Sequence, residues 1–286
     1  MNELMVKLRF LIPTLPRAEK AVAQALLEKP ELICLMTLAE LARETDSSDA
    51  SIIRFCRKMG YSGFSEMKQA FANALNDSSI MTVEEIHKED SVLDNLQKVY
   101  KSNMQTLTDT ILLADKEAYE EAVQVLLKAK SIHFFGTGDS AAVCQLFYFK
   151  FGRLGIPGSA QQDPVMQLME ASNLGPGDVA VIISYEGKSR TVLNAAKVAD
   201  ERGATIICIT KMSKSPLLRL SDISLFIATS DVTVGKDIVA RRVAEQMVID
   251  ALYLSVLVRS DKGYEKRLNS ASKSFELNKI RGKGFK

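Results

Sequence analysis

The fold class of this chain is decided by ten residues, SIHFFGTGDS at 131–140. The first half is a short apolar run, typical of a buried parallel strand, and the second half is a turn of small residues before an amphipathic helix. A second stretch, VAVIISYEGKS at 179–189, repeats this pattern. Strands and helices alternate from residue 131 onward, which predicts a doubly wound parallel sheet with helices on both faces. The predicted strands are 131–135, 179–183, 204–209 and 223–227, and the predicted helices are 141–154, 191–202 and 241–258.

The two turns predict a site for an anion. Ligands bind at the carboxyl ends of the strands in such sheets, and backbone N–H groups at a helix N-terminus attract phosphate. The glycines allow close backbone approach and the serines add hydroxyls. One such turn is weak evidence, but two at corresponding edges of one sheet favour a pocket for a phosphate and a polyol. The candidate ligand-binding residues are Gly136, Gly138, Ser140, Ser184, Glu186, Gly187 and Ser189.

The first 77 residues are predicted to be helical throughout. Pro16 opens a helix that ends at Lys29-Pro30, and Thr37 with Glu40 predicts a capping box. After a break at 46–48, Ser48 caps a helix from Asp49 to Met59, and Gly60 ends it. A further helix runs from Ser65 to Leu75, before a polar break at 76–79. Residues 80–128 are also predicted to be helical, as a linker followed by a segment that packs on the next domain.

The segment from Leu38 to Met59 has the two short helices and the tight break between them that are typical of a helix-turn-helix. Its second helix places apolar residues on one face and polar or cationic ones on the other and in its first turn. Arg54 with two serines suits base edges and phosphates, whereas Arg57 and Lys58 suit phosphates alone. The alternative is an ordinary helical hairpin with a solvated face, and the pattern by itself does not separate the two. The candidate DNA-binding residues are Ser48, Asp49, Ser51, Arg54, Arg57 and Lys58.

The run from Leu41 to Lys68, with SDASIIRFCRKMGYSGFSEMK at 48–68, resembles the N-terminal module of the RpiR family of bacterial regulators. Ser51 stands where that family usually has Thr. Asp46 occupies a turn position where Gly or Asn is usual, and Asp tolerates a left-handed conformation.

The same family joins this module to a sugar isomerase (SIS) domain, which residues 131–258 resemble through both loops, 161–167, 203–210 and 248–253. The resemblance therefore covers nearly the whole chain. It implies a DNA-binding domain at 1–77, a helical linker at 78–110 and a phosphosugar-binding SIS domain with a basic tail at 111–286. It further implies a regulator of sugar or amino-sugar metabolism, with operator DNA, a phosphosugar effector and a second copy of the chain as partners, in a homodimer or homotetramer.

Glu186 departs from the family's second loop, which usually has Ser at that position. A carboxylate near a bound phosphate would be repulsive. Three outcomes remain open. Glu186 turns away and pairs with Lys188 or Arg190, it accepts hydroxyls of a sugar whose phosphate lies elsewhere, or the ligand is not an ordinary phosphosugar.

Composition excludes several classes of protein. The chain has 286 residues, 47% hydrophobic and 25% charged, and a net charge of only +2, so bulk charge does not indicate nucleic acid. No apolar run is long enough for a membrane helix, and no secretory signal is evident. The four cysteines are far apart and fit neither a zinc site nor a disulfide framework. We therefore expect a cytoplasmic protein with no cofactor and no metal.

The basic tail from residue 259 to 286 has nine Lys and Arg against three Asp and Glu. It is interpreted either as a solvated helix end or as an extension that touches DNA or a partner.

The enzymatic alternative is aldose–ketose phosphate isomerisation in the same fold. That reaction needs a base of tuned pKa. His133 lies within a predicted strand and is expected in the core, His87 lies in the linker, and Glu186 and Glu245 lack an evident partner. We therefore expect no catalytic residues. A scaffold with an empty pocket is the third class, and it predicts no thermal shift with any sugar phosphate.

Overall fold

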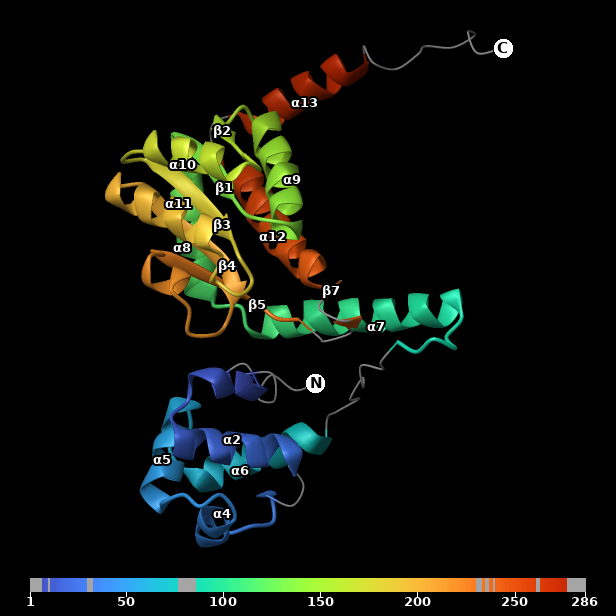
Figure 1. Ribbon diagram of the computed structural model, residues 1–286, viewed down its shortest axis with the longest axis vertical. Helices are drawn as coiled ribbons and strands as arrows, with labels where there is room; N and C mark the ends of the chain where they lie inside the picture. Colours follow the sequence, from blue (N-terminus) through green and yellow to red (C-terminus); the bar gives the residue numbers. More distant parts are fainter. Residues whose placement is uncertain are drawn as a thin grey trace. The chain divides into compact units, whose positions relative to one another are not determined.

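The computed structural model describes residues 7–9, 11–29, 33–76, 86–229, 233–234, 237–238, 240–260 and 263–276. The chain divides into two compact units. One comprises Met1–Ala114, Lys211–Lys214 and Phe226–Ala244, and the other comprises Asp115–Thr210, Ser215–Leu225 and Glu245–Lys286. Figure 1 shows the elements of both units. No helix among the described residues is long and apolar enough to cross a membrane.

The N-terminal helices begin and end where their sequence signals predict. Helix α2 spans Arg17–Glu28 and follows Pro16, and α4 spans Leu38–Glu44 with a complete capping box between Thr37 and Glu40. Helix α5 spans Asp49–Lys58, and Ser48 caps it by accepting a hydrogen bond from the amide of Ser51. Helix α6 spans Phe64–Asn76, one residue longer at each end than predicted. Of the predicted polar break at 76–79, Asn76 belongs to α6, and residues 77–79 lie outside the described residues.

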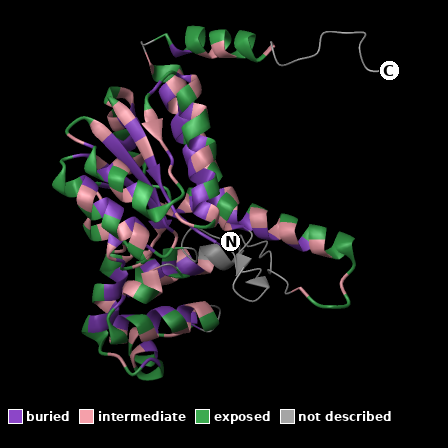
Figure 2. Cartoon of the chain, turned by 45° about the horizontal axis from the view of Figure 1, so that its top comes forward, coloured by how far each residue is buried: buried purple, intermediate pink, exposed green. Residues whose placement is uncertain are grey.

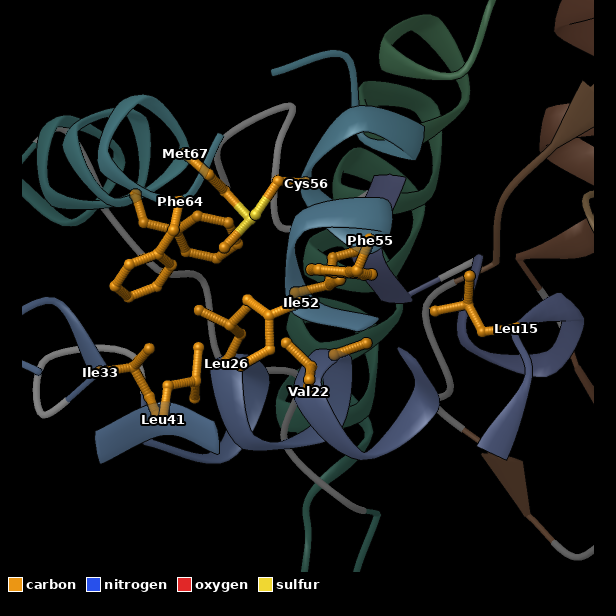
Figure 3. Packing of buried hydrophobic residues seen from close by; sticks show 13 residues of the cluster. Leu15, Val22, Leu26, Ile33, Leu41, Ile52, Phe55, Cys56, Phe64 and Met67 are labelled. Carbon is orange, nitrogen blue, oxygen red and sulfur yellow. The ribbon is translucent and has the colours of Figure 1, made fainter. Parts of the chain in front are cut away.

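These four helices share one apolar core, which Figure 3 shows from close by. Val22 and Leu26 of α2 meet Ile52 and Phe55 of α5, and all four side chains are buried. Burying a side chain of this size contributes about 1.5–3 kcal/mol, so the packing rather than helix propensity holds such short helices. Leu41, Cys56, Phe64 and Met67 also belong to this cluster.

The segment predicted to be helical at 80–128 contains two helices, and its first residues, 80–85, lie outside the described residues. Helix α7 spans Val92–Leu112, capped by Ser91 and Asp94, and α8 spans Lys116–Lys128, capped by Asp115. Val123 and Leu126 of α8 are buried, as expected of a segment that packs on the next domain. At its C-terminal end α7 contacts the segment after β5 (Ile223–Ile227), because the Thr110 hydroxyl accepts a hydrogen bond from the amide of Ala228.

The second half of the chain forms a five-stranded sheet of order β2-β1-β3-β4-β5. The strands are β1 (Ser131–Phe135), β2 (Gly158–Ser159), β3 (Asp178–Ile183), β4 (Thr205–Lys211) and β5. Strand β1 pairs in parallel with β2 and β3, and β3 pairs in parallel with β4. The register places Phe135 beside Ile182, so β1 and β3 end side by side. The strands predicted from the sequence are therefore confirmed to within two residues, and β2 is additional.

Helices cover both faces of this sheet, as predicted (Figure 1). On one face, α9 (Asp139–Arg153) and α12 (Arg241–Arg259) pack through aromatic contacts of Phe151 with Phe134 and Tyr253. On the other face, α10 (Pro164–Ser172) and α11 (Arg190–Glu201) cover Phe135, Ala180 and Ile182. Figure 2 shows the strands largely buried. A last helix, α13 (Tyr264–Phe275), is mostly exposed, and its Arg267 donates hydrogen bonds to the carbonyls of Leu154 and Gly155.

Candidate functional site

The two predicted ligand loops meet at the carboxyl edge of the sheet. In the order β2-β1-β3, the chain passes from β1 to β2 on one side and to β3 on the other. Doubly wound sheets bind ligands at such a switch point, so a ligand crevice is expected outside the ends of β1 and β3. The hydroxyls of Thr137, in the loop after β1, and Ser189, in the loop after β3, are 3.4 Å apart. Residues 136–140 and 184–189 are thus brought together, although about fifty positions separate them in the sequence.

Glycines shape both loops for steric reasons. Gly138 has φ +58°, a backbone conformation that side chains disfavour, and it is exposed at the start of α9. At Gly136 a Cβ atom would lie 2.9 Å from the Cys144 sulfur and 3.0 Å from the backbone of Ser140. Gly187 has φ +61°, and a Cβ there would lie 2.4 Å from the Ser215 hydroxyl. The compact turns therefore require glycine at these three positions.

Ser140 is not directed at solvent. Its hydroxyl donates a 2.9 Å hydrogen bond to Oε1 of Glu245 in α12, and both residues are buried. Burial, together with the Glu245 charge, raises the pKa of the nearby Cys144 thiol, so this cysteine is an inert part of the core. From the sequence, Glu245 is only a conceivable base. No sequence pattern links it to Ser140, which lies 105 positions away.

The second loop exposes its unusual acidic residue. Glu186 is exposed, whereas Ser184 and Gly187 on either side of it are buried, and Ser189 is half-buried. The amide of Gly187 donates to the carbonyl of Ser184, which closes the turn before α11. An exposed carboxylate is screened by water, so its repulsion of a nearby anion is weaker than in a buried site.

The first loop is supported by α10, a helix that the sequence did not predict. Gln167 of α10 is fully buried, and its side-chain amide donates to the carbonyls of Gly136 at 2.9 Å and Gln161 at 3.0 Å. Asp163 caps this helix by accepting from the amides of Val165 and Met166. The Asp-Pro pair at 163–164 is a helix-start signal that could have identified α10.

The two helices that follow the ligand loops begin without a side-chain cap. Helix α9 starts after Gly138, and α11 starts after Ser189, whose hydroxyl makes no capping bond. Side chains cap α4, α5, α7, α8 and α10, whereas α2 and α13, like α9 and α11, begin without a side-chain cap. The starts of α9 and α11 lie at the crevice, where the helix dipole favours a negative ligand.

In the N-terminal module, the first turn of α5 forms a short polar chain. The hydroxyls of Ser48 and Ser51 are 2.9 Å apart, and a guanidinium nitrogen of Arg54 donates to the Ser51 hydroxyl at 2.9 Å. Arg54, Ser48 and Asp49 are exposed, whereas Ser51 is buried. Ser51 therefore holds Arg54 in place from beneath.

The other two cations of α5 differ in their surroundings. Arg57 is exposed. Lys58 is also exposed, but its ammonium lies 3.3 Å from Oε2 of Glu19 in α2. Because Glu19 is buried, Lys58 neutralises a largely desolvated carboxylate, and removing either partner would leave the other charge without compensation.

Asp46 sets the turn between α4 and α5. It has φ +48°, the only positive value among the described residues other than glycine. The amide of Ser47 donates to the carbonyl of Ala42, and that of Asp46 to Arg43, which is the Schellman pattern of a helix end. The predicted left-handed aspartate is confirmed.

A helix-turn-helix module joined to a doubly wound sheet, with two glycine-shaped loops meeting at the sheet's carboxyl edge, defines a class of protein, the transcriptional regulators that carry their own ligand domain. The described residues contain no group of three or more His, Cys, Asp or Glu side chains that could hold a metal ion.

Comparisons with known proteins agree with that class. Residues 3–78 match the model of the helix-turn-helix domain of the rpiR family, and residues 125–255 match the SIS domain model. An uncharacterized HTH-type transcriptional regulator of Caldanaerobacter subterraneus is 34% identical over 98% of this chain and 99% of its own length. The HTH-type transcriptional regulator HexR of Pseudomonas aeruginosa is 31% identical, with 96% of each chain covered. The chain therefore belongs to the RpiR family of HTH-type transcriptional regulators with a C-terminal SIS domain.

Solved structures show the same architecture. The NanR protein of Vibrio vulnificus, complexed with ManNAc-6P, is 25% identical with a TM-score of 0.62, and the match covers 97% of this chain and 100% of NanR. A putative sugar-phosphate isomerase of Listeria monocytogenes, 17% identical with a TM-score of 0.59, covers 65% of this chain and shows the fold of the second half alone.

Proposed function

We propose that this chain binds operator DNA through α5, and that a phosphosugar bound at the crevice changes its affinity for that DNA. The observation that carries this proposal is the meeting of two glycine-shaped loops at the ends of β1 and β3, each followed by a helix without a side-chain cap. A phosphate suits that arrangement because amides and helix dipoles provide partial positive charge. A regulator of this kind works in the cytoplasm, where bacterial DNA lies.

In the DNA complex, α5 is the recognition helix. Arg54 contacts a base edge, preferably the O6 and N7 atoms of a guanine, because a guanidinium donates two parallel hydrogen bonds there. Ser48 at the exposed N-terminus of α5 contacts bases or phosphate, and Ser51 orients Arg54. Arg57 and Lys58 bind phosphates, while Asp49 accepts a hydrogen bond from a cytosine amine or stabilises the helix start.

In the effector complex, Gly136, Gly138 and Gly187 bring the backbone close to the phosphate. Ser184 and Ser189 supply hydroxyls, and Ser140 holds the first loop to Glu245. Glu186 stays in solvent or accepts sugar hydroxyls. The complex of NanR with ManNAc-6P supports an amino-sugar phosphate as the class of effector.

We propose further that the chain is a regulator without isomerase activity. Among its relatives, HexR is a transcriptional regulator, and the bifunctional protein glk of Burkholderia thailandensis matches over only 39% of its own length. His87 is exposed, and both ring nitrogens of His133 already contact side chains, so neither histidine is placed as a free base at the crevice.

We propose that the chain associates with a second copy through α7. Five apolar side chains on one stripe of α7 are exposed: Leu93, Leu96, Tyr100, Met104 and Ile111. Together they form a contiguous apolar surface, and such surfaces mark sites of protein–protein interaction. The buried face of the helix is instead polar and includes Gln105 and Asp109. A second copy is the partner that fits, because spacings of three and four residues suit helix-to-helix packing.

Operator binding and effector binding are separable, and one experiment tests both. A gel-shift assay with operator DNA selected from a random-sequence pool, titrated with ManNAc-6P, is expected to show a change in operator affinity of about fivefold or more. Arg54→Ala is expected to abolish specific binding and to leave the calorimetric affinity for ManNAc-6P unchanged. Lys128→Ala, which removes an exposed cation in α8, is the matched control. It is expected to retain both specific operator binding and the affinity for ManNAc-6P. Retained specific binding by Arg54→Ala would reject α5 as the recognition helix.

A further inference from the structure

The loop at 136–140, which follows β1, is held at both of its ends by buried side chains. At its start, the side-chain amide of Gln167 donates a 2.9 Å hydrogen bond to the carbonyl of Gly136. At its end, the Ser140 hydroxyl donates a 2.9 Å hydrogen bond to Oε1 of Glu245. Gln167 and Glu245 are both fully buried, and neither belongs to the loop. The packing of other elements therefore fixes where the loop begins and where it ends.

The two holding residues come from opposite faces of the sheet. Gln167 lies on α10, which packs with α11 on one face. Glu245 lies on α12, which packs with α9 on the other face (Figure 1). Because the two helices are separated by the sheet, the loop has two independent supports.

The two ends of the loop also touch each other. A Cβ atom at Gly136 would lie 3.0 Å from the backbone of Ser140 and 2.9 Å from the Cys144 sulfur. In such close packing, a movement of one end of the turn displaces the other end as well. Residues 137–139, between the two ends, are exposed or half-buried. The loop therefore combines fixed ends with an accessible middle.

The contact with Glu245 also determines what Ser140 offers to a ligand. A serine hydroxyl has one hydrogen to donate, and that of Ser140 is directed at a buried carboxyl group. Leaving a buried acceptor without its donor is destabilising, so Ser140 keeps this bond when a ligand arrives. The hydroxyl that the sequence assigns to the ligand is thus already used within the protein.

The affinity of such a loop for a small ligand depends on its order before binding. Backbone amides bind one small group together only if they are already aimed at the same point. Gly136 and Gly138 give the loop wide conformational freedom wherever nothing holds it. Without the two buried hydrogen bonds, binding would have to order the loop, and the loss of entropy would lower the affinity.

We propose that Glu245 and Gln167 are positioning residues of the effector site, which act through the two ends of the loop at 136–140 without touching the effector. Glu245 acts through the hydroxyl of Ser140, and Gln167 acts through the carbonyl of Gly136. The effect on effector affinity rests on the proposed function, whereas the hold on the loop does not.

The hold on the loop is tested without effector, by relaxation of the amide nitrogens of Thr137 and Gly138 in the full-length chain. Glu245→Leu and Gln167→Leu are each expected to make both amides more mobile than in the wild type. Ser140→Ala removes the same hydrogen bond as Glu245→Leu with a smaller change in the core, and it is expected to have the same effect. Wild-type mobility in these variants would refute the hold.

Two further variants separate this hold from a general loss of packing. Glu245→Gln keeps an oxygen that accepts from Ser140, and it is expected to keep the loop as ordered as in the wild type. Asp250→Asn is the matched control, because it weakens a contact between the same two helices, α12 and α9, at Lys150 in the second half of α9. It should also leave the loop ordered. A mobile loop in either variant would overturn the assignment of the hold to the bond between Ser140 and Glu245.

Calorimetry with ManNAc-6P tests whether Ser140 acts only through Glu245. Ser140→Ala and Glu245→Leu are each expected to lower the affinity about tenfold, the factor that corresponds to one hydrogen bond to a charged group. The double variant is expected to lower it no further, because each single variant already lacks the bond. Losses that multiply in the double variant would show that Ser140 contacts the effector directly, and they would overturn the role of Glu245.

The proposed function and the positioning role fail in different ways. If all variants with a mobile loop bind ManNAc-6P as tightly as the wild type, the effector site stands and the positioning role is wrong. If the wild type binds neither ManNAc-6P nor inorganic phosphate while the loop responds to Glu245→Leu and Gln167→Leu as expected, the proposed effector site is wrong. The effect on affinity is then wrong with it, and only the hold on the loop stands.

Discussion

At the scale of the residue, Asp46 carries a backbone strain that the turn between α4 and α5 requires. Its φ of +48° is a conformation that glycine adopts without strain and a β-branched residue adopts only at a cost of roughly 1–2 kcal/mol. Asp46→Gly is therefore expected to raise the free energy of unfolding, and Asp46→Val to lower it, as measured by urea denaturation of the full chain. Asp49→Gly is the control, because it removes an exposed aspartate from a helical position and should destabilise. Equal stability of the Gly and Val variants at position 46 would contradict the assigned strain.

At the scale of the element, the capping box of α4 makes that helix sensitive to acid. The amide and hydroxyl of Thr37 donate to the Glu40 carboxylate, which lowers the pKa of Glu40. A carboxyl whose pKa is lower in the folded state contributes stability above its unfolded pKa, and that contribution disappears as the pH falls through the folded value. The difference in free energy of unfolding between wild type and Glu40→Gln should therefore shrink between about pH 5 and pH 3. Glu28→Gln, at the exposed last position of α2 and outside the box, is the control. A difference that stays constant over that range would exclude the effect.

At the scale of the whole molecule, the stripe on α7 predicts the association state. Leu96→Asp with Tyr100→Asp places charges on the exposed apolar surface and is expected to reduce the mass in sedimentation equilibrium. Gln124→Asp, on the exposed side of α8, should keep the wild-type mass. The affinity of this double variant for operator DNA should also be lower than that of the wild type. The reason is that a dimer presents two recognition helices to half-sites about 34–36 Å apart or a multiple of that. A wild-type chain that sediments as a monomer would rule out the stripe as an interface.

The sequence by itself determines most of the helix ends and strands of this protein. Caps, glycine stops and apolar runs act over a few neighbouring residues, so Thr37, Ser48 and Gly60 are recognisable in the sequence, and four of the five strands are predicted nearly to the residue. Alternating strands and helices also dictate a parallel sheet, since only such a sheet can be connected that way. The meeting of the two ligand loops follows from the same rule.

Tertiary structure alone decided the contacts that act across the chain. Strand β2 has two residues, too few for any periodic signal, and exists because β1 offers it an edge. The hydrogen bonds from Ser140 to Glu245 and from Gln167 to Gly136 join residues 105 and 31 positions apart. A sequence pattern reports which side chains lie on one face, but the partner that satisfies a buried polar group is set only when separate elements pack together.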